Sequence, residues 1–275
     1  LGIASIWVIV WLVWPRFPES PSETLSVCAL DIGQGESIFI EFPNHQTMLI
    51  DGGGFYKNTP DVGKTILAPF LWNKGIGRIN YITATHSDND HISGLESLLA
   101  FFPVEHYLAR REDILDDRLW KLRSTALQHK TELVAFETGK PLLIGDVSLL
   151  PLHPDITYAN KHNPKGAEKN NTSLVLRLDY RTFNILLTGD MAEQAEQYLV
   201  DKGAPIQSDF LKAPHHGSKH SSTPAFIKAV APRDVIFSSG YLNHFNHPNP
   251  EVLARYKSVG AKIHRTDRDG AICIT

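Results

Sequence analysis

Six consecutive positions, 86 to 91, hold four side chains that can bind metal ions: His86, Asp88, Asp90 and His91. Imidazole nitrogens and carboxylate oxygens are common protein ligands of zinc and manganese. The run follows an apolar stretch at 79–85 that predicts a strand, and a strand end can direct several side chains toward one ion or two. The alternative is a polar loop in which Asp90 caps the helix that follows.

Further acids and imidazoles stand directly after apolar, strand-like segments. They are Asp51 in Asp-Gly-Gly-Gly, Asp190 in Thr-Gly-Asp, and the pair His215 and His216 in His-His-Gly-Ser. Taken singly, these are explained by a turn former, a helix N-cap and a solvated loop. Their recurrence at successive strand ends favours one metal site to which all of them contribute.

The elements that must position these residues alternate between strands and amphipathic helices. We expect strands at 25–31, 37–42, 47–50, 79–85, 173–178, 183–188, 210–213, 235–238 and 271–275, and helices at 92–102, 115–126, 192–202, 226–230 and 252–259. Sites of α/β domains form where polar residues gather at strand ends. The sequence therefore predicts an α/β domain with the ligands at one edge of its sheet.

The order of these motifs resembles the metallo-β-lactamase superfamily, whose usual run His-x-His-x-Asp-His reads His-x-Asp-x-Asp-His here because of Asp88. With Asp31-Ile-Gly-Gln-Gly upstream and Pro-His-His-Gly-Ser-Lys downstream, the pattern is similar to the C-terminal metallo-β-lactamase-like domain of the ComEC family. That family forms the DNA-uptake channels of bacterial competence. The resemblance covers residues 25–275 and implies an αββα sandwich with two metals at one edge of its two sheets.

The resemblance also implies a ligand set for two divalent ions, Mn²⁺ or Zn²⁺: His86 and Asp88 on the first ion, Asp90 and His91 on the second, Asp190 between them, and His215 completing the second site. Asp51 is expected to orient these ligands through hydrogen bonds. His216 is either the ligand in place of His215 or a contact to the substrate.

The first ion is expected to lack an imidazole that many members of the superfamily supply. His153 and His162 lie in the corresponding interval, and the amide of Asn171 is an alternative. Oxygen-rich ligation favours harder ions, so we expect Mn²⁺ to support more turnover than Zn²⁺, even where Zn²⁺ binds more tightly.

Two metal ions suit phosphodiester hydrolysis by a water held between Asp90 and Asp190. The leaving oxygen needs a proton or a positive neighbour, and His216, His247 and Lys219 are candidates. Ser218 and Lys219 are candidates for substrate contact, and surface solvation is the alternative explanation for all of these residues. Nearby cations could hold a nucleic-acid backbone: Lys212, Lys219 and His220, and a second stretch of Lys161, Lys165 and Lys169.

Three functions are compatible with these residues. The resemblance implies a nuclease that degrades the non-imported DNA strand, with DNA, the channel portion of the same polypeptide and other competence proteins as partners. A hydrolase of cell-envelope phosphodiesters is the second possibility, and a non-catalytic, metal-stabilised domain that guides DNA is the third. The net charge of −3 neither indicates nor excludes a nucleic-acid partner.

The start of the chain differs in composition from the rest. Residues 1–14 carry no charge and predict the C-terminal part of a transmembrane helix, against a buried core helix or a membrane-surface helix; a linker rich in Pro, Ser and Glu follows at 15–24. No positive cluster follows it, which favours a domain on the periplasmic or extracellular side of the inner membrane. Cys28 and Cys273 are expected to pack as small apolar residues and leave the redox compartment open.

Overall fold

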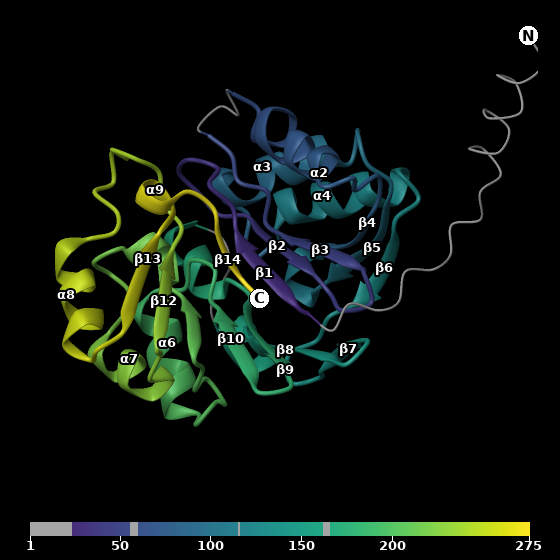
Figure 1. Ribbon diagram of the computed structural model, residues 1–275. Helices are drawn as coiled ribbons and strands as arrows, with labels where there is room; N and C mark the ends of the chain where they lie inside the picture. The colour runs from purple at the N-terminus through teal and green to yellow at the C-terminus, as the bar shows by residue number, and fades with distance from the viewer. Residues whose placement is uncertain (1–23, 56–59, 115, 162–165) are drawn as a thin grey trace, which may run out of the picture.

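Two seven-stranded sheets lie face to face, and helices cover the outer face of each (Figure 1). The computed structural model describes residues 24–55, 60–114, 116–161 and 166–275. This four-layer αββα arrangement is the fold that the sequence predicted. The parallel strands of each sheet deliver the chain to the same edge of the sandwich, and this edge holds the candidate ligands.

The first sheet is antiparallel at one side and parallel at the other. Its strands, in spatial order, are β14 (Ile272–Ile274), β1 (Ser26–Ala29), β2 (Ile38–Glu41), β3 (Thr47–Ile50), β4 (Ile79–Thr83), β5 (Val104–Ala109) and β6 (Glu132–Ala135). From β3 to β6 the neighbours are parallel, so the carboxyl ends of four strands meet at one edge.

The second sheet mirrors this pattern. Its strands, in spatial order, are β13 (Lys262–Arg265), β12 (Asp234–Phe237), β11 (Phe210–Lys212), β10 (Phe183–Leu187), β9 (Val175–Tyr180), β8 (Val147–His153) and β7 (Leu142–Ile144). Strands β10 to β13 run parallel, and β8 points the same way because β9 is antiparallel to both β8 and β10.

The helices fall into two groups, one for each sheet (Figure 1). Those of the first half are α2 (Ala68–Asn73), α3 (Asn89–Leu98) and α4 (Asp117–Gln128); those of the second half are α5 (Ile156–Lys161), α6 (Glu193–Asp201), α7 (Pro224–Val230), α8 (Pro250–Ser258) and α9 (Thr266–Asp269). Local signals fix several starts: Asp116 caps α4, Thr223 caps α7 and Asn249 caps α8.

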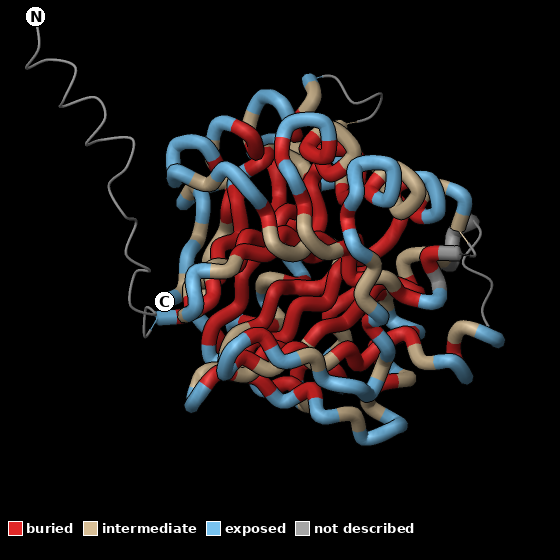
Figure 2. The backbone as a smooth tube through the Cα atoms, turned by 90° about the vertical axis from the view of Figure 1, so that its right-hand side faces the viewer, coloured by how far each residue is buried: buried red, intermediate tan, exposed pale blue. Residues whose placement is uncertain are grey.

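Alternation along the strands builds three apolar layers. In β2, Ile38 and Ile40 face the other sheet, whereas Phe39 packs under the helices of the first half. A third cluster lies between the second sheet and α6, α7 and α8. Figure 2 shows the result: the strands in the middle are buried, and the exposed positions lie on outer helices and turns.

The structure corrects three expectations. Cys28 and Cys273 do not pack as free thiols but form a disulfide between the neighbouring strands β1 and β14. The helix after the ligand run starts at Asn89, so Asp90 lies in its first turn and Asp88 is the N-cap residue, without a side-chain cap bond. Strands β5 to β8 and β13 were not predicted at all.

The predicted membrane segment at 1–14 and nearly all of the linker lie outside the described residues, as do His162 and Lys165. Among the helices that the structure does describe, none has both the length and the apolar composition that a membrane crossing requires.

Candidate metal centre

Four strands end at the site and each supplies part of it. Asp51 follows β3, the ligand run follows β4, Asp190 follows β10, and the His-His turn follows β11. Because β3 and β4 belong to one sheet and β10 and β11 to the other, the site spans both halves of the sandwich. This placement is what the sequence predicted for ligands at the edge of the sheets.

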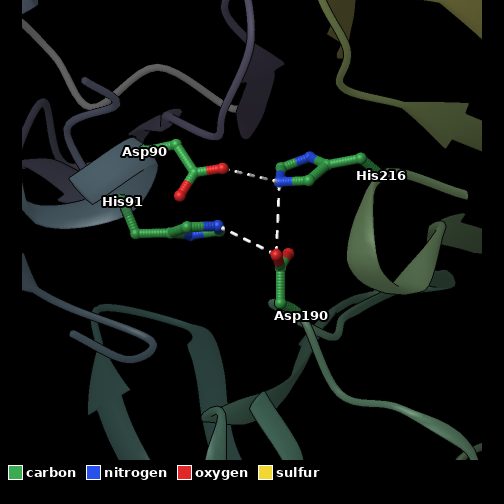
Figure 3. A group of neighbouring side chains, drawn as sticks. All are labelled: Asp90, His91, Asp190 and His216. Carbon is green, nitrogen blue, oxygen red and sulfur yellow. Dashed lines mark ion pairs between the residues drawn. The ribbon is translucent and has the colours of Figure 1, made fainter. Parts of the chain in front are cut away.

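Asp90, His91, Asp190 and His216 form one group whose ligand atoms all lie within 4.8 Å of one another. The side chains point toward a common centre (Figure 3). The His216 Nε2 is 3.3 Å from the Asp190 Oδ2 and 3.6 Å from the Asp90 Oδ2, and the His91 Nε2 is 3.3 Å from the same Asp190 oxygen. Two imidazoles and two carboxylates are a donor set that suits zinc or manganese.

Asp190 is the centre of this group. Its side chain is 4% exposed, and its Oδ2 faces three imidazoles, since the His215 Nε2 lies 3.7 Å away in addition to those of His91 and His216. Its Oδ1 is buried without a hydrogen-bond partner among the described residues. One oxygen of this carboxylate faces three imidazoles, and the other is available to bind an ion. This arrangement is suited to the bridging role predicted for Asp190.

Hydrogen bonds on the far side of the rings fix two of these imidazoles. The Nδ1 atom of His91 lies 2.7 Å from the Asp51 Oδ2, and the Nδ1 of His216 donates to the Ser238 carbonyl at 2.7 Å. Asp51 is fully buried, and it also accepts bonds from the backbone N–H and the hydroxyl of Thr85. Asp51 and the Ser238 carbonyl therefore fix the two rings, and the Nε2 atoms are left to face the centre.

Several buried nitrogen and oxygen atoms of the site are available to bind a metal ion. The Nε2 atoms of His86, His91 and His216 are buried and lack a hydrogen-bond partner within the described ranges, as does the Asp190 Oδ1. Buried polar atoms without partners are unfavourable, so several around one point indicate a ligand that satisfies them together. The group thus fits a divalent cation.

The side of the site assigned to the first ion is built differently. The His86 Nε2 lies 3.5 Å from the Asp88 Oδ2, and the ammonium of Lys169 pairs with the other Asp88 oxygen. The His215 Nε2 lies 3.5 Å from the Asn170 amide nitrogen and 3.7 Å from the Asp190 Oδ2. His215 is therefore near Asp190 but does not belong to the four-residue group, so the geometry favours His216 as the second-site imidazole.

Opposite charges within the group stabilise one another. Burial opposes the charged form of His216, but the carboxylates of Asp190 and Asp90 outweigh it and raise its pKa to about 9. The pKa of His91 is likewise raised despite burial, because Asp190 and Asp51 face it. The same imidazoles hold the pKa of Asp190 well below its usual range against the effect of burial. The carboxylates therefore favour positive charge at this point.

Two residues considered for the first ion have other roles. The Asn171 side-chain oxygen accepts the backbone N–H groups of Ala192 and Ala195, so it fixes the start of α6 beside Asp190 and is not directed at a metal. His153 is fully buried at the end of β8, where its Nε2 donates to the Asn171 carbonyl. Burial lowers the pKa of His153 to about 4. Neither side chain supplies the missing ligand.

The residues expected to contact the substrate divide into exposed and buried ones. His247 is half-buried, and its ring centroid lies 5.7 Å from that of His215. Burial and the neighbouring imidazoles lower the pKa of His247 to about 4, so it is neutral near pH 7 in the metal-free protein. Lys219 is exposed, whereas Ser218 is buried and its hydroxyl accepts the His220 N–H within the turn.

Lys212 is not a surface cation, contrary to expectation. Its side chain is fully buried and forms an ion pair with Glu36, which is fully buried as well. The Lys212 ammonium also donates to the Gly189 carbonyl, and the Glu36 backbone pairs with the Asp90 and Gly53 backbones. This ion pair joins the ligand loops of the two sheets. In the sequence, Lys212 and Glu36 are each a single charged residue beside an apolar run. Residue types alone do not indicate that the two side chains meet.

Close backbone packing sets the position of α3. A Cβ at Gly94 would lie 1.9 Å from the Gly52 carbonyl oxygen, and one at Gly52 would lie 2.4 Å from the Leu95 nitrogen. Glycine at both positions lets the helix approach the loop that carries Asp51. The Asp51 carboxylate can therefore reach His91 from the neighbouring strand end.

With this fold and ligand arrangement, the chain belongs to the metallo-β-lactamase superfamily, whose family model matches residues 30–240. The solved structure of the metallo-β-lactamase fold protein YhfI from Bacillus subtilis superposes with a TM-score of 0.58 at 12% identity, over 92% of this chain and 99% of that one. At such low identity the likeness shows the fold alone.

Two curated relatives match this chain at higher identity. The chain is 32% identical over 88% of its length to ComE operon protein 3 of Bacillus subtilis, and 30% identical over 93% to the competence protein ComA of Neisseria gonorrhoeae. It covers 32% and 33% of their lengths, so it spans about a third of each relative. The resemblance to ComEC-type domains is thereby confirmed, and the domain is a metallo-β-lactamase superfamily hydrolase domain of the kind found in competence proteins.

Proposed function

We propose that this chain is a metal-dependent phosphodiesterase that hydrolyses DNA and degrades the non-imported strand during DNA uptake. One observation carries the proposal, in a chain related to competence proteins: two imidazoles and two carboxylates form a group in which all but Asp90 are buried. Three atoms of this group, the Nε2 atoms of His91 and His216 and the Asp190 Oδ1, have no hydrogen-bond partner among the described residues. Two divalent ions, bound by this group together with His86 and Asp88, would supply Lewis acidity at phosphorus and a water activated near neutral pH.

The protein's own residues divide the remaining work. The Asp90 and Asp190 carboxylates orient the attacking water by accepting its hydrogen bonds, and Asp51 holds the His91 ring. His216 serves as a ligand rather than a proton donor, because its Nδ1 already donates to a carbonyl and its Nε2 faces two carboxylates. Lys219 is exposed and follows His216 by three positions, so it remains the candidate cation for neutralising the leaving oxygen.

An aromatic loop beside the imidazoles supports a nucleic-acid substrate. Tyr241, Leu242 and Phe245 are 76%, 80% and 65% exposed, and the Phe245 ring stacks on that of His247 with centroids 5.7 Å apart. Exposed large apolar side chains gathered on one loop favour a binding surface, and aromatic rings are stacking partners for unpaired bases. Such a loop beside a phosphodiesterase centre favours single-stranded DNA.

The disulfide supports a location outside the cytoplasm. Disulfides persist in oxidising compartments and are rare in the cytosol, so Cys28–Cys273 favours the periplasmic or extracellular side of the inner membrane. In that position the domain would work beside the channel portion of the same polypeptide and other competence proteins.

The test is hydrolysis of end-labelled single- and double-stranded DNA by the purified chain, stripped of metal and reloaded with Mn²⁺ or Zn²⁺. We expect metal-dependent cleavage that Asp190→Asn abolishes and that the exposed control Asp146→Asn leaves intact. Salt-dependent DNA binding without cleavage would instead favour the guiding domain. Cleavage of envelope phosphodiesters but not of DNA would favour the second hydrolase.

A further inference from the structure

A pocket of about 660 Å³ lies between the ends of β5 and β6 on one sheet and the end of β8 on the other. Three arginines line it: Arg110 and Arg111 follow β5 directly, and Arg123 comes from α4. None of them takes part in the metal centre described above.

The pocket and the metal centre share one edge of the sandwich. Strands β3, β4, β5 and β6 are parallel neighbours, so the ends that carry Asp51, the ligand run and Arg110 stand in a row. Adjacent strands are about 4.8 Å apart, which places the β6 end roughly 10 Å from the β4 end. That span corresponds to about three base steps of roughly 3.4 Å along a DNA strand.

Helix α4 connects the two places. Its cap residue Asp116 accepts the Ser87 hydroxyl at 2.6 Å, and Arg118 donates to the Ser87 carbonyl at 2.7 Å. Ser87 lies within the ligand run. Arg123 stands five positions after Arg118, about 7.5 Å further along the helix axis. One helix therefore touches the metal loop with its first turn and lines the pocket with a later one.

The two carboxylates among the described residues that line the pocket are each matched by a cation. Glu137 pairs with Lys140 at 2.6 Å, and Asp155 pairs with Lys202 and accepts the Tyr198 hydroxyl. Because these acids are already neutralised, Arg111 and Arg123 give the pocket a net positive charge.

Arg110 lines the pocket from below and is held by the fold. This residue is 5% exposed, and its Nε and Nη1 atoms are buried. Its ion-pair contact is with Asp113, whose Oδ1 lies 3.4 Å from the Arg110 Nε. The accessible positive charge of the pocket therefore comes from Arg111 and Arg123.

Much of the remaining lining is apolar. Leu133, Phe136 and Ile156 contribute carbon surface to the same pocket as the arginines. A ligand that matches both parts has an anionic group with planar or bidentate oxygens and an uncharged, flat body. A nucleotide unit, with its phosphate and base, combines the two.

We propose that this pocket is a strand-binding subsite, which holds a phosphate and its nucleotide a few positions from the phosphodiester at the metal centre. The proposal rests on the proposed nuclease function for the identity of the strand. Arg111 and Arg123 contact the phosphate from the accessible side. A free nucleotide offers the same chemistry, so the test separates it from a strand.

The test variant is Arg111→Gln combined with Arg123→Gln in the full chain, with Arg110 retained because it is buried. Arg78→Gln is the matched control: Arg78 is 61% exposed and lies at the amino end of β4, on the opposite edge of the same sheet. Binding of a fluorescent oligothymidylate is measured by anisotropy in EDTA, where no hydrolysis consumes the probe.

We expect the double variant to bind the oligonucleotide roughly tenfold more weakly than wild type and Arg78→Gln. Its salt dependence should become less steep by about 0.7 in log–log slope for each phosphate that it no longer binds. Equal affinity and slope in the double variant and the control would overturn the subsite, as would a wild type that binds no oligonucleotide. Displacement of the probe by deoxyadenosine monophosphate as effective as by unlabelled oligonucleotide would also overturn it, in favour of a free nucleotide.

Hydrolysis of bis(4-nitrophenyl) phosphate by the metal-loaded proteins separates this inference from the nuclease proposal. That small diester is too short to span both the metal centre and the pocket, so wild type and double variant should cleave it equally. If neither protein cleaved it while the double variant still bound the oligonucleotide more weakly, the subsite would stand and the nuclease assignment would fall. Equal cleavage with unchanged oligonucleotide affinity would reject the subsite alone.

Discussion

Replacing Asp190 by asparagine tests the centre of the site with the smallest change in shape. The Asp190 Oδ2 faces the Nε2 atoms of His91, His215 and His216 at 3.3, 3.7 and 3.3 Å. Asparagine keeps the size of the side chain but removes the negative charge that holds cations there. The three apolar layers do not depend on this charge, so the fold should persist.

The magnitude follows from His216. Its pKa rises from 6.5 to about 9 despite burial, so Asp190 and Asp90 together favour a positive charge at its Nε2 by about 3 kcal/mol. Assigning half of this to Asp190 and doubling it for a divalent ion gives about 3 kcal/mol again. We therefore expect Asp190→Asn to weaken divalent metal binding by about two orders of magnitude and to abolish hydrolysis.

Metal affinity is measured by calorimetric titration of the stripped protein, with circular dichroism to verify the fold. Asp146→Asn removes an exposed carboxylate between β7 and β8 and should leave both affinity and hydrolysis unchanged. A folded Asp190→Asn protein that bound metal as tightly as wild type, or cleaved DNA at a similar rate, would refute the bridging assignment.

Four further outcomes are expected. Mn²⁺ should restore nuclease activity to stripped protein better than Zn²⁺, and Asp88→His should shift the preference toward zinc; activity restored only by Zn²⁺, and unaffected by the substitution, would show that Asp88 does not set the metal. Deleting residues 1–18 should leave the circular dichroism of a folded domain, and loss of the fold would make that segment a core helix. Cys28→Ser with Cys273→Ser should lower the free energy of unfolding in guanidinium by about 5 kcal/mol, because the disulfide closes a loop of 245 residues; equal midpoints would contradict this. Burial raises the pKa of Glu196 from 4.5 to about 7, so the protonated carboxyl group is favoured in the folded protein. Its contribution to the free energy of unfolding is complete below pH 4.5 and is lost as the pH rises through 7. Urea unfolding should therefore show wild-type stability falling by about 3 kcal/mol relative to Glu196→Gln over this range, and parallel pH profiles would exclude the effect.

The ligand loops could be predicted because their information is local. The run from 86 to 91 and Asp190 each follow an apolar strand within a few residues, and both strands form where expected. The choice between His215 and His216 is different. Both residues adopt left-handed backbone angles, φ 47° and 54°, and this tight turn decides which ring reaches the group. No feature of residue type or spacing specifies such a turn.

The remaining differences arise from contacts across long stretches of sequence. Strand β8 contains Pro151, which argues against a strand, yet it pairs with β9 around an irregularity next to that residue. The arginine pocket combines residues after β5, on α4 and after β8. The Cys28–Cys273 bond depends on pairing between the first and last strands. The strand, the pocket and the disulfide each depend on residues that come together only when the sheets form, so the sequence alone does not predict them.

The same bond has a mechanical consequence. Strands β1 and β14 lie side by side (Figure 1), and the disulfide between them is the one covalent cross-link among the described residues. Tension applied to the chain before Cys28 and after Cys273 would pass through the sulfur atoms and bypass the loop of 245 residues that contains the ligands. If a neighbouring protein pulled on the chain, the sandwich would then move as a rigid body, and the distances among the candidate metal ligands would stay unchanged.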